Sequence, residues 1–464
     1  MWVGMASLLC TAACGQAEVD LSDGSGLAAL SAPAKPRLAL VDKADILFVI
    51  DNSNSMADEQ AALRAQFPKL ITALTHGERY PGDPRPFAPV HDLHIGVVST
   101  DMGTPGFELG TCHGNGGDDG RLRHTPTMSA DGRACAAQYP AFLSADIQSQ
   151  DDIDQLSHDF SCIAQIGIGG CGFEQPLESA LKALWPATYV DANGRVVQPN
   201  PVEFVSLPWS GNPLVIGPPP GLRPGLPPEQ TAVPLSPWPS QPASSVGRGD
   251  QDPAQGGNRG FLRDAIEDPS LLVIVLVSDE DDCSLEQFDV LKPPTLLPKD
   301  SPYLRVPDLN LRCFKHPEVM YSVRERYLQA FRALRPGHEE LVVFSAIVGV
   351  PSDLVDQGAL AAHDFADEAQ RNAFYAGILN DPRMQEVVDP ASLPGMGGGN
   401  LTPSCRRPVG DGSVAVSTAY PPRRAVALAQ AFGEHGLVQS ICQDDFGPAV
   451  DSILDMMTRS LTLR

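Results

Sequence analysis

The stretch ILFVIDNSNSM, residues 46–56, decides which fold the sequence predicts. Five apolar residues lead directly into Asp51, and Ser53 and Ser55 follow it at a spacing of two. A short, continuous apolar run is typical of a strand buried on both faces, as in a parallel sheet covered by helices. A strand that ends in Asp51-x-Ser53-x-Ser55 would place one carboxylate and two hydroxyls at its carboxyl end, where such sheets bind their ligands.

Further apolar runs predict other strands of the same sheet, at residues 93–99, 271–277, 341–350 and 437–441. Alternation of strands with helices favours an α/β, doubly wound domain with a mostly parallel central sheet flanked by helices. Pro68 is expected to kink or break the first helix. The helical stripes are Leu63, Phe67, Leu70, Ile71 and Leu74; Ile153, Leu156, Phe160 and Ile163; Leu177, Leu181 and Leu184; Val323, Tyr327, Phe331 and Leu334; then residues 421–432 and 446–457.

The first 14 residues are apolar but too short to span a bilayer as a helix, and they have the length of a signal-peptide core. Ala12-Ala13 before Cys14 resembles a bacterial lipobox, in which the cysteine becomes lipidated. We therefore expect an exported protein, either secreted or a cell-envelope lipoprotein, possibly of the outer membrane, that contacts a membrane only through this anchor. Residues 15–40 are expected to form a flexible tether.

Composition narrows the classes of function. The 464 residues carry a net charge of -24, which excludes a general nucleic-acid binder because phosphate contacts need a basic surface. The 44 prolines and 42 glycines predict long loops. We place one domain over residues 41–464, with insertions near 104–139, 199–260, 285–320 and 380–418. The middle of the proline-rich second insertion is expected to be poorly ordered, with polyproline character.

Eight cysteines remain after Cys10 and Cys14, and none forms a CxxC motif. An even number of cysteines in an exported chain favours disulfides over zinc or redox motifs. The simplest expectation pairs neighbours in order, although sequence alone does not fix connectivity and one or two free thiols stay open as an alternative. These pairs are Cys112–Cys135, Cys162–Cys171, Cys283–Cys313 and Cys405–Cys442.

The oxygen donors of the opening stretch suit a hard divalent cation, Mg²⁺ or Ca²⁺, with Mn²⁺ also possible. The run 271–277 is followed by Ser278-Asp279-Glu280-Asp281-Asp282, so Asp279 would reach the same edge if the two strands are neighbours. A cation would remove the repulsion between such carboxylates. Asp281 and Asp282 are expected to be solvated, or part of a disulfide-pinned loop around Cys283. The alternative for the opening stretch is a plain helix-capping turn.

Asp51-x-Ser53-x-Ser55 after an apolar strand, with a later strand that ends at Asp279, resembles the von Willebrand factor A (vWA) domain. The segments VIDNSNSM, HIGVVSTDMG, GCGFEQPLESALKAL and VIVLVSDEDDCS together are similar to exported bacterial vWA proteins. The resemblance covers roughly residues 41–464. It implies a metal-ion-dependent adhesion site (MIDAS) built from these residues, with an open position that an acidic residue of a partner protein fills.

The family usually supplies a threonine from a loop before a helix, and here that loop is GGCGFEQPL, residues 169–177. Glu174 or Gln175 stands about where the threonine would fall, and Glu174 could bind the ion directly or through water. An extra carboxylate would favour calcium and weaken the attraction for an acidic partner. Glu174 could instead serve the helix start electrostatically. Thr100 and Asp101, after the second strand, are further candidates.

The same loop contains a GxGxxG pattern, residues 167–172, which resembles a dinucleotide-binding motif. That motif requires a preceding apolar strand, whereas the preceding residues here end an amphipathic helix. We expect a tight loop between two helices, pinned by Cys162 and Cys171.

The sequence therefore predicts a protein-binding module rather than an enzyme, and no catalytic residues are assigned. One alternative is a secreted metal-dependent hydrolase, in which the cation activates water and Glu174 or Asp281 acts as the base. A second alternative is a disulfide-stapled envelope protein with a vestigial metal site.

Overall fold

The computed structural model describes residues 41–104, 117–127, 129, 131–191, 193–204, 246–292, 297–306, 308–392, 399–408, 416–443 and 445–461. All of them belong to the unit Leu38–Arg464. The predicted signal peptide, Cys14 and the tether lie outside the described residues, as does the middle of the proline-rich insertion. No helix among the described residues is long and apolar enough to cross a membrane.

The central sheet has six strands in the order β3-β2-β1-β4-β5-β8, and five of them run parallel. The run that ends at Ile50 and the four further runs predicted from the sequence form these five parallel strands. This confirms the predicted parallel sheet. Only β3 runs antiparallel, against β2. The strands are β1 (Lys43–Ile50), β2 (Asp92–Ser99), β3 (Leu143–Asp146), β4 (Leu271–Val277), β5 (Val342–Val348) and β8 (Gly436–Ser440).

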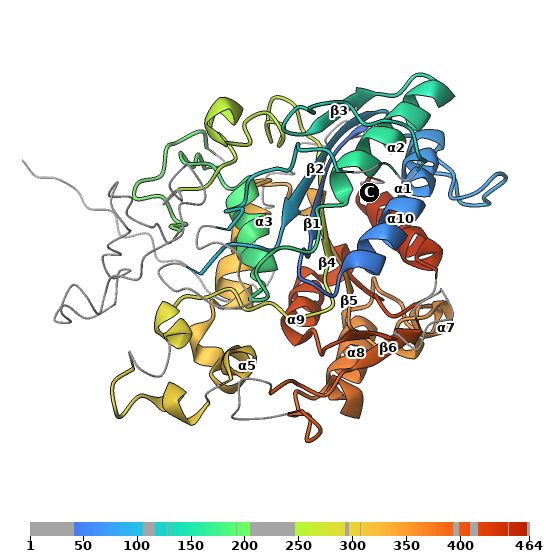
Figure 1. Cartoon of the computed structure of the whole chain (residues 1–464). Coiled ribbons are helices and arrows are strands. Elements are labelled where there is room, and N and C mark those ends of the chain that lie inside the picture. Colours follow the sequence, from blue (N-terminus) through green and yellow to red (C-terminus); the bar gives the residue numbers. More distant parts are fainter. Residues whose placement is uncertain are drawn as a thin grey trace, which may run out of the picture. The chain divides into compact units, whose positions relative to one another are not determined.

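Helices cover both faces of the sheet, so the fold is α/β and consistent with a doubly wound arrangement (Figure 1). One apolar core joins alternate residues of β1 and β4 to α1 (Ala57–His76), α2 (Gln150–Ala164) and α10 (Gly447–Leu461). The other core joins the intervening strand residues to α3 (Pro176–Leu184), to α9 (Arg423–Phe432), and to the π-helical η7 (Val323–Leu328) with α6 (Gln329–Ala333).

The predicted helices all form, with one correction. Helix α1 continues through Pro68, so a break at this residue does not occur. Pro68 lies on the exposed face of the helix, where water can satisfy the carbonyl group that the proline cannot bond.

The insertions carry short elements only. The described parts of residues 104–139 contain no helix or strand. A small antiparallel hairpin, β6 (Cys405–Pro408) with β7 (Val416–Ala419), was not predicted.

The remaining elements of the described chain lie both inside and outside the insertions. They are η1 (Pro253–Gln255), η2 (Phe288–Leu291), η4 (Pro302–Arg305), η5 (Leu309–Leu311), α5 (Arg312–Lys315), η6 (Pro317–Val319), η8 (Glu339–Leu341), η9 (Ser352–Leu354), α7 (Gln357–Ala361), α8 (Glu368–Asn380), η10 (Pro382–Met384) and η11 (Gly433–His435).

Two of the expected disulfides are confirmed and two are wrong. Cys283 pairs with Cys313 and Cys405 with Cys442, as neighbours in sequence order. Cys162, however, bonds Cys135, with 5.8 Å between their Cα atoms. The pairs Cys112–Cys135 and Cys162–Cys171 are thereby excluded, because Cys162 in the last turn of α2 already bonds Cys135, and the neighbouring Ala134 carbonyl contacts His158 of the same helix. Cys171 is disulfide-bonded as well.

The strand order positions the candidate site. From β1 the chain adds β2 and β3 on one side of the sheet, and β4, β5 and β8 on the other. The boundary between β1 and β4 is therefore the topological switch point, where connections leave in opposite directions and open a crevice at the carboxyl ends of the strands. Asp51 is the first residue after β1, and Asp279 is the second residue after β4.

Candidate functional site at the switch point of the sheet

The Asp51 carboxylate is fully buried and held by hydroxyl and amide donors. Its Oδ1 accepts the backbone N–H of Ser53 at 2.7 Å, and its Oδ2 accepts the Ser278 hydroxyl at 2.6 Å. Its own N–H donates to the Val277 carbonyl at 2.9 Å, which ties it to β4. Burial raises the pKa of Asp51, and the hydrogen bonds from Ser278 and Ser53 oppose this effect. The group is thus fixed in position without a cationic partner.

The two serines of the motif lie together. The Ser53 and Ser55 hydroxyl oxygens are 3.3 Å apart. Helix α1 begins at Ala57, and its N-cap, Met56, has no side-chain cap hydrogen bond. Neither serine side chain therefore caps α1, whereas the Asp51 carboxylate accepts the Ser53 N–H within the turn.

Asp279 is 1% exposed, and among the described residues its carboxylate oxygens form no hydrogen bond of ordinary geometry, although the Ser55 hydroxyl lies near them. Burial raises its pKa well above the ordinary value, and the nearby charges of Asp51 and Glu280 raise it further. The Ser55 hydroxyl acts in the opposite direction. These influences show that Asp279 shares one small region with Asp51 and Ser55, as expected for two neighbouring strands. Unpartnered, buried carboxylate oxygens are costly unless a ligand satisfies them.

Glu174 also lies in this region. It is 2% exposed, and its Oε1 has no hydrogen-bond partner among the described residues. Burial raises its pKa well above the ordinary value, and the charges of Glu280 and Asp51 add to the effect. The Leu177 and Glu178 N–H groups in the first turn of α3 donate to Asp282 and to the Ser284 hydroxyl oxygen, so Glu174 does not cap this helix.

Gln175, the alternative at this position, is occupied elsewhere. Its amide nitrogen donates to the Gly103 carbonyl at 3.2 Å, and its amide oxygen accepts the Leu285 N–H at 3.2 Å. The side chain thereby joins three loops to one another. Of the two residues proposed in place of the threonine, only Glu174 has an oxygen left for a ligand.

Glu280 is a site residue that sequence reasoning missed. Burial and the charge of Asp51 raise its pKa to about 7, and the nearby Glu174 carboxyl group acts in the opposite direction. Its N–H bonds the Ser278 hydroxyl at 3.1 Å, so the chain turns sharply here. In an extended strand, Glu280 would point away from Asp279, and only the turn brings both carboxylates to the same side of the edge. Its position next to Asp279 was the one available signal.

Asp281 and Asp282 are not solvated, which corrects the first of the two expectations for them. Asp281 accepts the Arg424 N–H at the start of α9, at 3.0 Å. Asp282 is 3% exposed, accepts the Leu177 N–H at 3.0 Å and pairs with the Arg424 side chain at 2.9 Å. The second expectation holds, since the Cys283–Cys313 disulfide pins this loop.

Thr100 and Asp101 lie close to the motif. The Thr100 hydroxyl is 3.5 Å from Asp51 Oδ1, at the limit of a hydrogen bond. Asp101 accepts the N–H groups of Gly103 at 2.8 Å and Cys171 at 3.2 Å, while burial raises its pKa to about 6. The Asp101 carboxylate therefore holds these loops together and is not free to serve as a metal ligand.

The glycine-rich stretch forms a loop between α2 and α3, as predicted, although Cys162 does not pin it. The Gly170 N–H donates to the Asn52 carbonyl at 2.8 Å. A Cβ at Gly170 would lie 2.1 Å from the Asn52 side-chain oxygen. A larger residue here would have to displace the Asn52 side chain, because the loop lies directly against the Asp51 turn.

The carboxylates of the site lack positive neighbours. No ion pair between described residues includes Asp51, Glu174, Asp279 or Glu280, whereas nearby arginines pair with other acids, Arg407 with Glu59 and Arg424 with Asp282. No group of three or more His, Cys, Asp or Glu side chains in the described part of the chain is arranged to hold a metal. The predicted acids Asp51, Asp279 and Glu174 therefore do not form such a group with one another, and the predicted set adds the hydroxyls of Ser53 and Ser55 to them. That these residues bind a metal stays a prediction.

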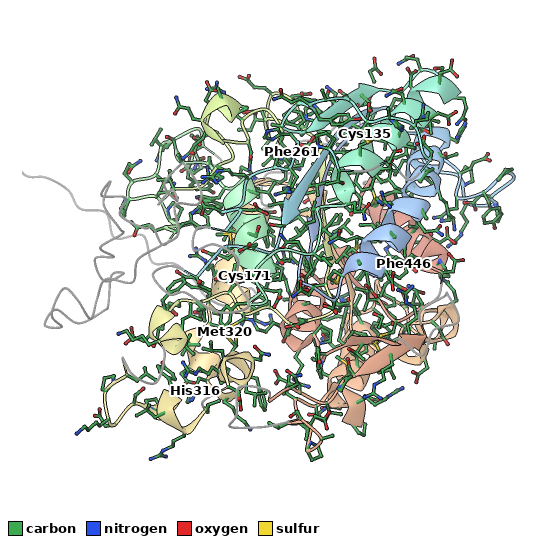
Figure 2. The ribbon with its side chains drawn as sticks, viewed as in Figure 1. Cys135, Cys171, Phe261, His316, Met320 and Phe446 are labelled. Atoms are coloured by element: carbon green, nitrogen blue, oxygen red, sulfur yellow. A yellow bond between two sulfur atoms is a disulfide. The ribbon has the colours of Figure 1, made fainter. Side chains whose placement is uncertain are left out.

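A pocket opens beside this region. Its walls combine acidic and apolar side chains with the Cys283–Cys313 disulfide. Among the lining residues are Phe173, Glu174, Glu280, Met320, Tyr420 and Arg424. In Figure 2 the labelled Cys171 and Met320 mark this part of the molecule. The surface next to the site is thus hollowed and predominantly negative.

Comparisons of the chain with protein-family models, with curated proteins and with solved structures find no match.

Proposed function

We propose that this chain is a binding protein of the vWA type, which holds a divalent cation at Asp51, Ser53, Ser55 and Asp279 and through it binds a protein partner. The observation that carries the proposal is the pair of buried carboxylates, Asp51 and Asp279, next to two hydroxyls at the switch point of a parallel sheet. Oxygen donors of this kind suit Mg²⁺ or Ca²⁺, and Mn²⁺ less specifically.

A bound cation would offset the charges that repel one another in this region. The oxygens of Asp279 and the Oε1 of Glu174 form no hydrogen bond of ordinary geometry among the described residues, so they are acceptors that a cation could use. Glu174 would contribute directly or through water, and this additional carboxylate favours Ca²⁺ over Mg²⁺. When bound, the cation supplies positive charge and an open coordination position.

The partner would place an acidic group on that open position. Because the adjoining pocket is itself acidic, an acidic partner would be repelled unless the cation is present. Recognition should therefore depend on the metal more strongly than on any apolar contact. The insertions around the edge would supply specificity.

Export, with or without a lipid at Cys14, is part of the same proposal. The disulfides Cys135–Cys162, Cys283–Cys313 and Cys405–Cys442 support it, because disulfides persist mainly in oxidising compartments.

Thermal unfolding with Ca²⁺, Mg²⁺ or EDTA tests the site directly. A ligand that binds only the folded state stabilises it by about 2.7 kcal/mol at a hundredfold excess over Kd. We expect a clear rise in melting temperature for the wild type, no rise for Asp51→Ala, and a normal rise for the control Asp300→Ala, which removes an exposed carboxylate. An unresponsive wild type would leave the vestigial-site alternative.

If the cation binds, a partner captured in Ca²⁺ or Mg²⁺ should be released by EDTA and should not bind Asp51→Ala. Equal capture by the variant would refute the metal-bridged mechanism. Of the two bases proposed for the hydrolase alternative, Asp281 accepts the Arg424 N–H at the start of α9, whereas Glu174 keeps an oxygen without a hydrogen bond among the described residues.

A further inference from the structure

A carboxylate, an imidazole and a disulfide sulfur stand in line on the face of the sheet that α2 covers. Both carboxylate oxygens of Asp131 are 3.1 Å from Nδ1 of His158. Nε2 of the same ring is 3.8 Å from Sγ of Cys162, which is bonded to Cys135 (labelled in Figure 2). This group is remote in sequence from the Asp51 motif and takes no part in the proposed metal site.

Both ring nitrogens of His158 face hydrogen-bond acceptors. Nδ1 faces the Asp131 carboxylate, and Nε2 faces the Ala134 carbonyl at 3.3 Å as well as the sulfur. A neutral imidazole has one N–H and can satisfy only one of these acceptors, whereas the protonated ring donates to both. The residue is 7% exposed, so water screens the contact between the ring and the sulfur only weakly.

The two sulfurs of this disulfide differ in access. Cys162 is fully buried, whereas Cys135 is partly exposed. A thiolate must approach a disulfide along the axis of the bond that breaks, at the sulfur it can reach. Attack therefore falls on Cys135, and Cys162 becomes the leaving group. The exchange is faster when the leaving thiol has a low pKa, and a neighbouring imidazolium lowers the pKa of a thiol.

We propose that Cys135–Cys162 is a thiol-exchange site, at which a small thiol forms a mixed disulfide with Cys135 and releases Cys162. The attacking thiolate forms a bond to Cys135 Sγ, and the electron pair of the broken bond goes to Cys162 Sγ. Nε2–H of His158 donates to that sulfur, and Asp131 holds the ring in place as a positioning residue. The proton of the incoming thiol goes to solvent, so no oxidant or reductant other than the thiol is needed.

The other two resolved disulfides serve as internal references. Among the described residues, no hydrogen bond joins a histidine to a sulfur of Cys283–Cys313 or Cys405–Cys442, whereas Cys162 has one. Exchange at these bonds therefore lacks the imidazole that we propose stabilises the leaving thiolate of Cys162. The contrast can therefore be measured within one protein molecule.

The test treats the folded protein with reduced glutathione, traps free thiols with an alkylating agent, and maps the products by mass spectrometry. We expect glutathione on Cys135, alkylation of Cys162, and exchange on the order of tenfold faster than at Cys405–Cys442. His158→Gln should slow exchange at Cys135–Cys162 to about the rate of Cys405–Cys442 and leave the latter unchanged. The control His76→Gln, which removes an exposed histidine, should behave as wild type.

Three outcomes would overturn the proposal: glutathione found on Cys162, exchange no faster than at Cys405–Cys442, or an unchanged rate in His158→Gln. The first two are measured on the wild type and do not depend on whether a variant folds. Asp131→Asn retains the imidazole and serves as a second variant, expected to fall between wild type and His158→Gln. A wild-type rate in Asp131→Asn would remove the positioning role.

Discussion

A buried aspartate lies near each end of strand β1, Asp45 within the strand and Asp51 directly after it. The two carboxylates differ in their hydrogen-bond and ion-pair partners. Asp45 accepts hydrogen bonds from Ser270 at 2.5 Å and Arg335 at 3.0 Å, and it also pairs with Arg263. Asp51, six residues later, has hydroxyl and amide donors but no cationic side chain among the described residues. Arginine side chains of the protein itself thus neutralise the Asp45 carboxylate, whose role is structural. The difference supports the proposal that an external cation completes the Asp51 end.

Removal of the Asp45 carboxylate should be strongly destabilising. Asp45→Ala would leave the guanidinium of Arg335, which is itself 1% exposed, buried without its charge partner. Loss of one member of such a buried pair costs about 3–5 kcal/mol in the free energy of unfolding. Denaturant unfolding in EDTA measures it. Asp268→Ala, which breaks a more exposed pair with Lys43, should cost at most about 1 kcal/mol and serves as control.

The stability of the metal-free protein should fall as pH rises through the titration range of the site. Glu280 has a folded pKa of about 7 against an ordinary value of 4.5, so between these values the folded state holds more protons than the unfolded state. A rise in pH then favours unfolding. In EDTA, the free energy of unfolding should decrease from pH 5 to pH 7.5, and Glu280→Gln should decrease less. An equal decrease in both proteins would contradict this assignment.

At the scale of elements, the loop that follows β4 organises the site by holding the starts of two helices. Asp282 accepts the Leu177 N–H of α3, and Asp281 accepts the Arg424 N–H of α9. The Cys283–Cys313 disulfide closes the same loop. The carboxylates of Asp279 and Glu280 are therefore carried on a segment with little freedom to move apart. This rigidity explains how like charges can be kept close together.

Two glycines should respond in opposite directions to alanine. A Cβ at Gly436, where β8 begins, would lie 1.9 Å from the Ala429 carbonyl oxygen of α9, so Gly436→Ala must push a helix away from the sheet. We expect a loss of about 1–3 kcal/mol. Gly377, inside α8, has nothing within 4 Å of the new methyl group, so Gly377→Ala should stabilise by about 0.5–1 kcal/mol. Denaturant unfolding measures both changes. If the free energy of unfolding changed in the same direction in both variants, packing around the new methyl group would not be what decides the effect.

At the scale of the whole described unit, the β6–β7 hairpin is held against the sheet by distant contacts. Cys405 at its start bonds Cys442, just beyond the end of β8. Arg407 and Ser417 both donate to the Glu59 carboxylate, in the first turn of α1. The hairpin thereby reaches the helix that follows the Asp51 motif. An insertion far along the chain becomes a neighbour of the candidate site.

Loss of this disulfide should loosen the hairpin. The two cysteines are 37 residues apart, and a crosslink of this span contributes about 2–4 kcal/mol. The double variant Cys405→Ala/Cys442→Ala should melt at a lower temperature and should be cleaved by protease first within the hairpin. Cleavage elsewhere first, with the hairpin intact, would show that the Glu59 contacts hold it without the crosslink.

The sequence by itself determined the five parallel strands, the helices on both faces and the placement of Asp51 and Asp279 at one edge. It could do so because continuous apolar runs and helical stripes are local patterns that burial enforces. Only the tertiary structure decided that Glu280 belongs to the site, that Gln175 does not, and that Cys162 bonds Cys135. These outcomes depend on turns and on contacts between segments far apart in the chain, and local periodicity carries no information about either.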